Sequence, residues 1–248
     1  MSRKVVLITG AAKGIGKAIA LELAQNNYDI VINYLTSSKQ AFELQETIKN
    51  KFKVNCLAIK ADVSNELEVN SMFNEIESKL GNVDILINNA AIDLSNMFNL
   101  KTAEQFRRVL DVNVVGAYNC ANRAYKNMLD KEYGRIINIS STNGINTYYP
   151  MCFDYDASKA ALISLTHNLA IQFAPYVNVN AIAPGFIGTE SELANYDDEF
   201  LKQEEDKILK KRCGKPEEVA HLVKFLISSD ADYINNSVIR IDGGQYGS

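Results

Sequence analysis

The chain has 248 residues, of which 47% are apolar and 23% charged, and its formal net charge is −4. This composition excludes disordered, collagen-like and coiled-coil proteins, and the acidic balance disfavours nucleic-acid binding, which depends on clustered Lys and Arg. No apolar run approaches the ~20 residues that a membrane helix needs.

The N-terminus and the cysteines predict an intracellular protein. The apolar stretch after Lys4 stops at Thr9, far short of the about 7–15 residues of a signal peptide. The four cysteines show neither CxxC nor metal-ligand spacing. We therefore expect a cytoplasmic protein with reduced thiols, no bound metal, and neither a membrane nor a nucleic acid as partner.

Two kinds of segment alternate along the chain. Short β-branched runs, several apolar on both faces as in covered parallel strands, predict strands at 5–9, 30–33, 54–59, 85–88, 135–140, 177–183 and 238–242. Apolar residues with a period near 3.6 predict helices at 15–25, 40–51, 66–80, 103–129, 155–174 and 217–227. The alternation favours an α/β fold, a doubly wound Rossmann-type parallel sheet in one domain over 1–248; a (β/α)₈ barrel is the competing fold.

A glycine-rich turn joins the first strand to the first helix and reads TGAAKGIG over residues 9–16. With 13 glycines in the chain, three at these offsets are expected by chance about 0.03 times. Glycines here permit a tight turn and close approach to a pyrophosphate, which then meets the free N–H groups of the helix. A plain turn rich in small residues is the alternative. The predicted cofactor contacts are Gly10, Lys13, Gly14, Ile15 and Gly16.

The end of the second strand bears on the choice of nucleotide. NAD(H) is usually held by an acid about 20 residues past the turn, but Asn33, Tyr34 and Ser37 lie in that region without a carboxylate. An acid there would repel a 2′-phosphate, whereas hydroxyls and Lys13 suit one. We expect a preference for NADP(H), with NAD(H) as the alternative if Lys13 and Lys39 are ordinary surface charges.

Tyr155 and Lys159 stand four residues apart at the start of a predicted helix and so share a face. Ser141 follows the predicted strand 135–140, at the edge where doubly wound folds bind ligands. An ammonium close to the phenol is expected to lower its pKa from about 10. Tyr155 then donates a proton to a carbonyl oxygen as a nicotinamide donates hydride, and Ser141 hydrogen-bonds the developing alkoxide.

These motifs, together with Asp62-Val63, Asn88–Ala91, Asn113 and Pro184-Gly185 through Thr189, resemble those of the short-chain dehydrogenase/reductase family, and the pattern is most similar to bacterial 3-oxoacyl-[acyl-carrier-protein] reductases. The resemblance implies a seven-stranded sheet and a homotetramer joined through helices 103–129 and 155–174. It also implies a mobile substrate lid at about 189–213.

The resemblance assigns roles residue by residue. Asn113 would anchor a water relay to Lys159, which would also hold the nicotinamide ribose. Asp62 and Val63 would contact the adenine, Asn89 and Ala90 the ribose, and Ile187 and Thr189 the carboxamide. Ala91 replaces the usual glycine and slightly crowds the cofactor.

The expected substrate is a small carbonyl compound or an acyl thioester. Carrier-protein reductases present arginines beside the active-site mouth, but the matching positions hold Glu132 and Tyr176, so an acyl carrier protein stays an open partner. Two other functions are considered: oxidation of a sugar or other secondary alcohol by the same residues, and a catalytically silent dinucleotide sensor.

Overall fold

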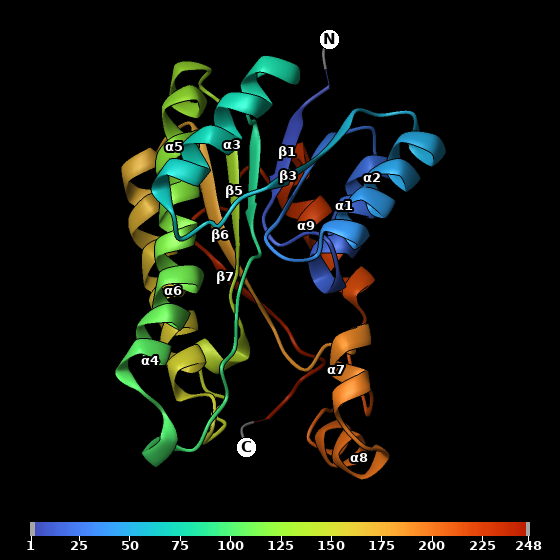
Figure 1. Cartoon of the computed structure of the whole chain (residues 1–248), viewed down its shortest axis with the longest axis vertical. Coiled ribbons are helices and arrows are strands. Elements are labelled where there is room, and N and C mark those ends of the chain that lie inside the picture. The colour runs from blue at the N-terminus through green and yellow to red at the C-terminus, as the bar shows by residue number, and fades with distance from the viewer. Residues whose placement is uncertain (1–2, 247–248) are drawn as a thin grey trace.

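A computed structural model describes residues 3–246, the side chain of residue 195 excepted. Its core is an open, fully parallel seven-stranded sheet of order β3-β2-β1-β4-β5-β6-β7 (Figure 1). The strands are β1 (Val5–Ile8), β2 (Asp29–Tyr34), β3 (Cys56–Lys60), β4 (Ile85–Asn88), β5 (Gly134–Ile139), β6 (Val177–Pro184) and β7 (Val238–Ile241). The doubly wound prediction is confirmed and the barrel is wrong, because β3 and β7 remain edges.

The alternation of side chains along β1 explains why both faces of the sheet are covered. Val6 and Ile8 pack into one apolar core, with α1 (Gly14–Gln25), α2 (Ser38–Phe52) and α9 (Pro216–Ile227). Val5 and Leu7 pack into the other, with α3 (Glu66–Lys79), α5 (Gly116–Asp130) and α6 (Phe153–Phe173). Figure 1 shows the two helix layers on opposite sides of the strands.

The predicted helix 103–129 is not one regular helix. It consists of α4 (Ala103–Leu110), a π-helical turn η2 (Asp111–Val115) and α5. A π turn inserts an extra residue into the helix, often at a functional site, and a periodicity of 3.6 does not reveal it. The helix does begin where a capping motif stands, because Thr102 accepts the backbone N–H of Gln105 and the Gln105 side chain accepts that of Thr102.

The strand order reverses between β1 and β4, which pair with each other in parallel. Ligands of open α/β sheets bind at the carboxyl ends of the strands at such a point. The segments after β1, β4 and β5 therefore define the region of the candidate site. None of the helices in the described part of the chain is long and apolar enough to span a membrane.

Candidate active site

The glycine turn after β1 packs directly against the segment after β4. Gly10 and Gly14 have φ of +62° and +56°, in the left-handed region that glycine adopts without strain. A Cβ on Gly10 would lie 2.9 Å from the Cα of Ala90, and one on Gly16 would lie 2.7 Å from the side-chain nitrogen of Asn89. The α1 N-cap makes no side-chain hydrogen bond, so the first N–H groups of the helix are left for an anion.

The segment after β4 is fixed to the same turn by Thr9. The Thr9 hydroxyl accepts the backbone N–H groups of Asn89 and Ala90, both at 2.9 Å, and the Asn89 side chain donates to the Thr9 carbonyl at 2.8 Å. Ala91 lies outside the left-handed backbone region, so the methyl group that replaces the usual hydrogen causes no backbone strain. The two predicted cofactor segments are thus parts of one rigid edge.

Asn33 supports the glycine turn from the end of β2. Its buried side-chain oxygen accepts the Gly10 N–H at 3.2 Å, and its side-chain nitrogen donates to the Ala61 carbonyl at 3.0 Å. Tyr34 is buried with its ring edge-on to that of Phe42. The contact with Gly10 gives Asn33 a structural part in shaping the turn, which the sequence did not indicate, whereas Tyr34 packs against α2.

The residues beside the end of β2 that face solvent carry no carboxylate. Ser37 is half-buried before α2, and Lys13 is exposed at the turn. Lys39 is exposed and lies 4.0 Å from Glu43 in a loose ion pair. Ile15 is partly buried against the core on this side of the sheet.

Asp62 and Val63 follow β3, at the same edge of the sheet. Burial raises the pKa of the Asp62 carboxyl, but hydrogen bonds from Ser64 and Arg108 outweigh that effect, and the pKa is lowered. Val63 packs tightly on α5, where a Cβ on Gly116 would lie 2.5 Å from it. A charged Asp62 oriented by Arg108 is therefore a fixed acceptor at this edge.

Asn113 lies inside the π turn and is fully buried. Its side-chain oxygen accepts the Ile92 N–H at 2.8 Å, and its side-chain nitrogen donates to the Ile92 carbonyl and to the Ser158 hydroxyl, both at 3.0 Å. The amide therefore ties the segment after β4 to α6, one residue before Lys159. Both polar atoms of the Asn113 side chain take part in these hydrogen bonds.

Ser141, Tyr155 and Lys159 come together at the carboxyl end of β5. The Ser141 hydroxyl donates to the Asn143 side-chain oxygen at 3.1 Å and lies close enough to the Tyr155 phenol to lower its pKa. The Lys159 ammonium lies 5.3 Å from the centre of the Tyr155 ring. Lys159 donates to the Ile139 carbonyl at 2.8 Å. The neighbouring Ser140 hydroxyl instead donates to the Lys159 carbonyl at 2.9 Å, which leaves Ser141 as the serine that faces Tyr155.

The pKa of Tyr155 differs from the sequence expectation. Burial is the largest effect and raises the pKa, the charge of Asp93 raises it further, and the Ser141 hydroxyl lowers it. The prediction of a lowered pKa is wrong here, because burial of the phenol dominates and the Lys159 ammonium, which donates to the Ile139 carbonyl, is not among the groups that shift it. Burial lowers the pKa of Lys159 to about 8.

The segment after β6 lies beside the glycine turn. Thr189 lies against the glycine turn, since a Cβ on Gly14 would be 3.5 Å from its methyl group. Its hydroxyl caps α7 (Glu190–Asn195) by accepting the Glu192 N–H, and Ile187 bridges to Gly214. The segment begins with Pro184, the last residue of β6, and Gly185, where a Cβ would lie 2.6 Å from that of Asp242.

The expected lid segment 189–213 contains α7 and α8 (Asp198–Asp206). The α8 residue Glu204 is buried and joins this segment to the residues before Tyr155. The Tyr149 hydroxyl donates to its carboxylate at 2.6 Å, and Lys207 pairs with it at 2.7 Å. The rings of Tyr196 and Phe200 stack 4.3 Å apart beside it.

Sequence reasoning did not single out three carboxylates whose charges act on the Tyr155 phenol. Asp93, Glu192 and Asp156 each raise the pKa of Tyr155 by charge repulsion, after the larger effect of burial. Asp93 also raises the pKa values of Glu192 and Asp156, again after burial. They come from three separate segments, so no local motif could have revealed this acidic environment.

Glu132 and Tyr176 do not lie near the candidate catalytic residues of their own chain. They precede β5 and β6, whereas Ser141 follows the end of β5. Six strand residues span about 20 Å, which separates the two positions from the catalytic edge. The expectation that they stand beside the mouth is wrong for a single chain.

The residues at this edge fit a dinucleotide. The turn offers glycines at two left-handed positions, an uncapped helix N-terminus for a pyrophosphate, and backbone close enough to the β4 segment to exclude any side chain. Ser141, Tyr155 and Lys159 stand at the next strand end, where a nicotinamide ring would lie.

Comparison with known proteins agrees with this geometry. Residues 10–245 match the family model described as enoyl-(acyl carrier protein) reductase. A 3-oxoacyl-[acyl-carrier-protein] reductase of Staphylococcus aureus is 38% identical over 98% of both chains. The crystal structure of an acetoin dehydrogenase from Salmonella typhimurium superposes with a TM-score of 0.88 at 34% identity, covering 98% of this chain and 96% of that one.

A putative gluconate dehydrogenase of Agrobacterium tumefaciens superposes with a TM-score of 0.93 at 30% identity, over the same shares of the two chains. The relatives thus share fold and length while their names give different substrates. The matched family model, the identity over nearly the whole chain and the strand order together establish that the chain belongs to the short-chain dehydrogenase/reductase family, as an NAD(P)-dependent oxidoreductase acting on CH–OH or C=O groups.

Proposed function

We propose that the protein reduces a carbonyl to a secondary alcohol with NADPH, with Tyr155 as the general acid. The observation that carries this proposal is the cluster of Ser141, Tyr155 and Lys159 at the strand end next to the glycine turn. The bound nicotinamide supplies hydride to the carbonyl carbon. Tyr155 supplies the proton to oxygen, and Ser141 orients that oxygen by a hydrogen bond.

The protonation states of Tyr155 and Lys159 near neutral pH are those that proton donation in a reduction needs. Tyr155 is protonated near neutral pH, which is the form that donates a proton, although the raised pKa makes the free phenol a weaker acid. The pKa of Lys159, about 8, keeps its ammonium charged there, 5.3 Å from the centre of the Tyr155 ring. Asn113 acts indirectly, because its amide holds Ser158 and therefore the backbone of α6 beside Lys159.

The preference for NADPH rests on the end of β2, where no carboxylate stands to repel a 2′-phosphate. The test is a comparison of NADPH and NADH on acyl-carrier thioesters, acyl-CoA thioesters and small ketones, in both directions. Faster reduction of at least one carbonyl with NADPH supports the proposal. Tight NADPH binding without turnover across the panel would instead support a silent dinucleotide sensor.

The acidic environment of Tyr155 favours a second candidate substrate class, neutral hydroxyl-bearing ketones or alcohols. Asp93 has one oxygen bound to Ser95 at 2.6 Å, and the residue is exposed on the loop after β4. Like charge at the mouth disfavours phosphate-bearing thioesters, whereas a carboxylate accepts hydrogen bonds from substrate hydroxyls. The named substrate of the acetoin dehydrogenase relative is of this neutral kind.

Asp93→Asn is expected to separate the two classes. Removing the charge should lower KM for an acyl-CoA thioester by about 3–10-fold at low salt, and the effect should shrink as salt screens it. KM for diacetyl, which is neutral, should change less than about 2-fold by the same reasoning. Steady-state kinetics at two ionic strengths measures both, and Asp130→Asn on α5 is the matched control. An equal change for both substrates would contradict a charge effect.

We further propose a homotetramer assembled through α5 and α6. Both helices expose large apolar side chains, Tyr118 at 48% and Ile171 at 70%, which a monomer gains nothing by exposing. Sedimentation velocity should give a single species of four chains. Ile171→Glu should dissociate it, and a tetramer unaffected by that change would exclude α6 as the interface.

A further inference from the structure

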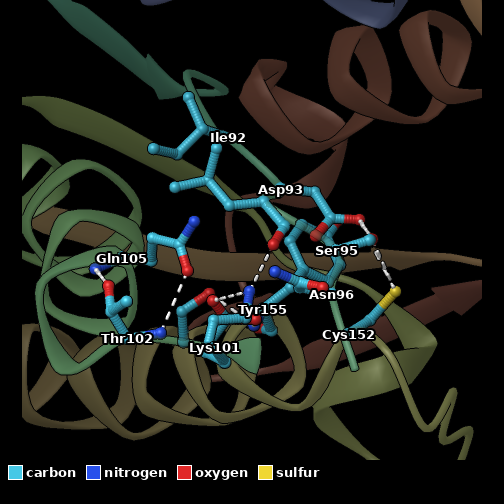
Figure 2. Close-up of polar contacts among 12 residues, drawn as sticks. Ile92, Asp93, Ser95, Asn96, Lys101, Thr102, Gln105, Cys152 and Tyr155 are labelled. Atoms are coloured by element: carbon cyan, nitrogen blue, oxygen red, sulfur yellow. Dashed lines mark hydrogen bonds and ion pairs between the residues drawn. The ribbon is translucent and has the colours of Figure 1, made fainter. Parts of the chain in front are cut away.

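The loop after β4 is fastened to the start of α6 by a buried ion pair. Lys101 and Asp154 lie 2.7 Å apart, with side chains 3% and 0% exposed. Figure 2 shows Lys101 beside the helix turn that carries Tyr155. Buried ion pairs contribute little net stability against apolar replacements, so this pair calls for an explanation other than stability alone.

Each partner of the pair also holds backbone of a different segment. The Lys101 ammonium donates to the Leu94 carbonyl, which keeps the loop folded back on itself. The second oxygen of Asp154 accepts the backbone N–H of Tyr155 at 3.1 Å. A continuous chain of polar contacts therefore runs from the loop to the backbone of the proposed acid.

Further contacts join the same two segments. The Asn96 N–H donates to the Met151 carbonyl at 3.1 Å, and the Ser95 hydroxyl and the Cys152 thiol lie 3.2 Å apart (Figure 2). The Phe98 and Phe153 rings pack 5.3 Å apart. The loop after β4 and residues 151–155 thus form one unit, which contains the buried charges of Lys101 and Asp154.

We propose that Lys101 and Asp154 are positioning residues, which fix Tyr155 relative to the segment after β4 and so hold its hydroxyl at the reacting carbonyl. This inference rests on the proposed function of Tyr155. It follows from the geometry that the loop, which begins at the cofactor-lining segment 89–91, sets the place of the acid. A misplacement of about 1 Å can cost about 100-fold in rate.

The central test is a double-mutant cycle with Lys101→Met and Tyr155→Phe, assayed with NADPH and diacetyl or the best carbonyl of the panel. Lys101→Met should lower kcat about 10–100-fold with the Kd for NADPH within about 2-fold. In the Tyr155→Phe background it should lower the residual rate less than about 2-fold, because there is no hydroxyl left to misplace. Equal factors in both backgrounds would overturn the proposal.

A second set of variants separates positioning from stability. Lys101→Met leaves a buried unpaired carboxylate and should lower the Tm, whereas the neutral combination K101M/D154N should restore the Tm and keep the low kcat. Recovery of both would show that the pair only stabilises the fold. Lys79→Met is the matched control, because it breaks an exposed pair of the same 2.7 Å length far from Tyr155.

The failure of the proposed function is distinguishable from the failure of this inference. If Tyr155→Phe retains the full rate, or the wild type reduces nothing in the panel, the assignment of Tyr155 fails. The pair is then judged by crystal structures of the wild type and K101M/D154N. A phenol displaced by about 1 Å or more supports positioning, and an unmoved phenol refutes it.

Discussion

Tyr155→Phe is expected to lower kcat for carbonyl reduction by about 10²–10⁴-fold, which corresponds to about 3–5 kcal/mol of barrier. The phenylalanine ring keeps the packing and the contact with the Lys159 ammonium, which lies 5.3 Å from the ring centre. Only the hydroxyl that Ser141 contacts is removed. The loss is therefore expected in kcat, and the Kd for NADPH should change little.

Single-turnover oxidation of NADPH and a fluorescence titration of cofactor binding measure the two quantities separately. Tyr233→Phe is a suitable control, because Tyr233 is fully exposed near β7. A Tyr155→Phe variant with wild-type turnover would remove Tyr155 from the mechanism. A loss confined to cofactor affinity would make Tyr155 a binding residue.

Above about pH 8, kcat/KM for reduction is expected to fall about tenfold per pH unit, and to be level from pH 6 to 7.5. The pKa of Lys159 is lowered to about 8 by burial, so its ammonium is present below that pH and is lost as the pH rises through it. The Tyr155 phenol does not cause this alkaline fall in kcat/KM, because burial raises its pKa.

Lys159→Arg tests whether Lys159 causes the alkaline fall in kcat/KM. A guanidinium stays charged throughout this range, so the variant should lose the alkaline fall even if its rate is lower at every pH, because its shape differs from that of an ammonium. If kcat/KM of Lys159→Arg still falls above about pH 8, another group causes the fall.

The fold was largely predictable because its signals are local. Strands apolar on both faces and helices with a 3.6 period need only neighbouring residues, and they identified the doubly wound sheet. The π turn at Asn113 was not predicted, because the hydrophobic pattern of the helix runs through it unchanged. The helices α7 and α8 were expected only as a lid-like segment, since they are short and polar.

The candidate site was predictable to the extent that its residues lie after strand ends. Ser141, Tyr155 and Lys159 do meet, because the carboxyl ends of parallel strands, and the segments that continue from them, share one edge of the sheet. The direction of the Tyr155 pKa was not predictable, since it depends on burial and on the charges of Asp93 and Glu192 from other segments. Glu132 and Tyr176 were placed at the wrong edge because sequence position alone does not give distance.

The sequence by itself determined the order of strands and helices along the chain, the glycine turn and the candidate reacting side chains, because each depends on residue type and short spacing. Only the tertiary structure decided that Lys101 pairs with Asp154, that Asn113 clamps Ile92 to α6, and that three carboxylates converge on one phenol. These features depend on contacts and charges between segments that the fold brings together, and the loss of water around the buried groups makes those charges count.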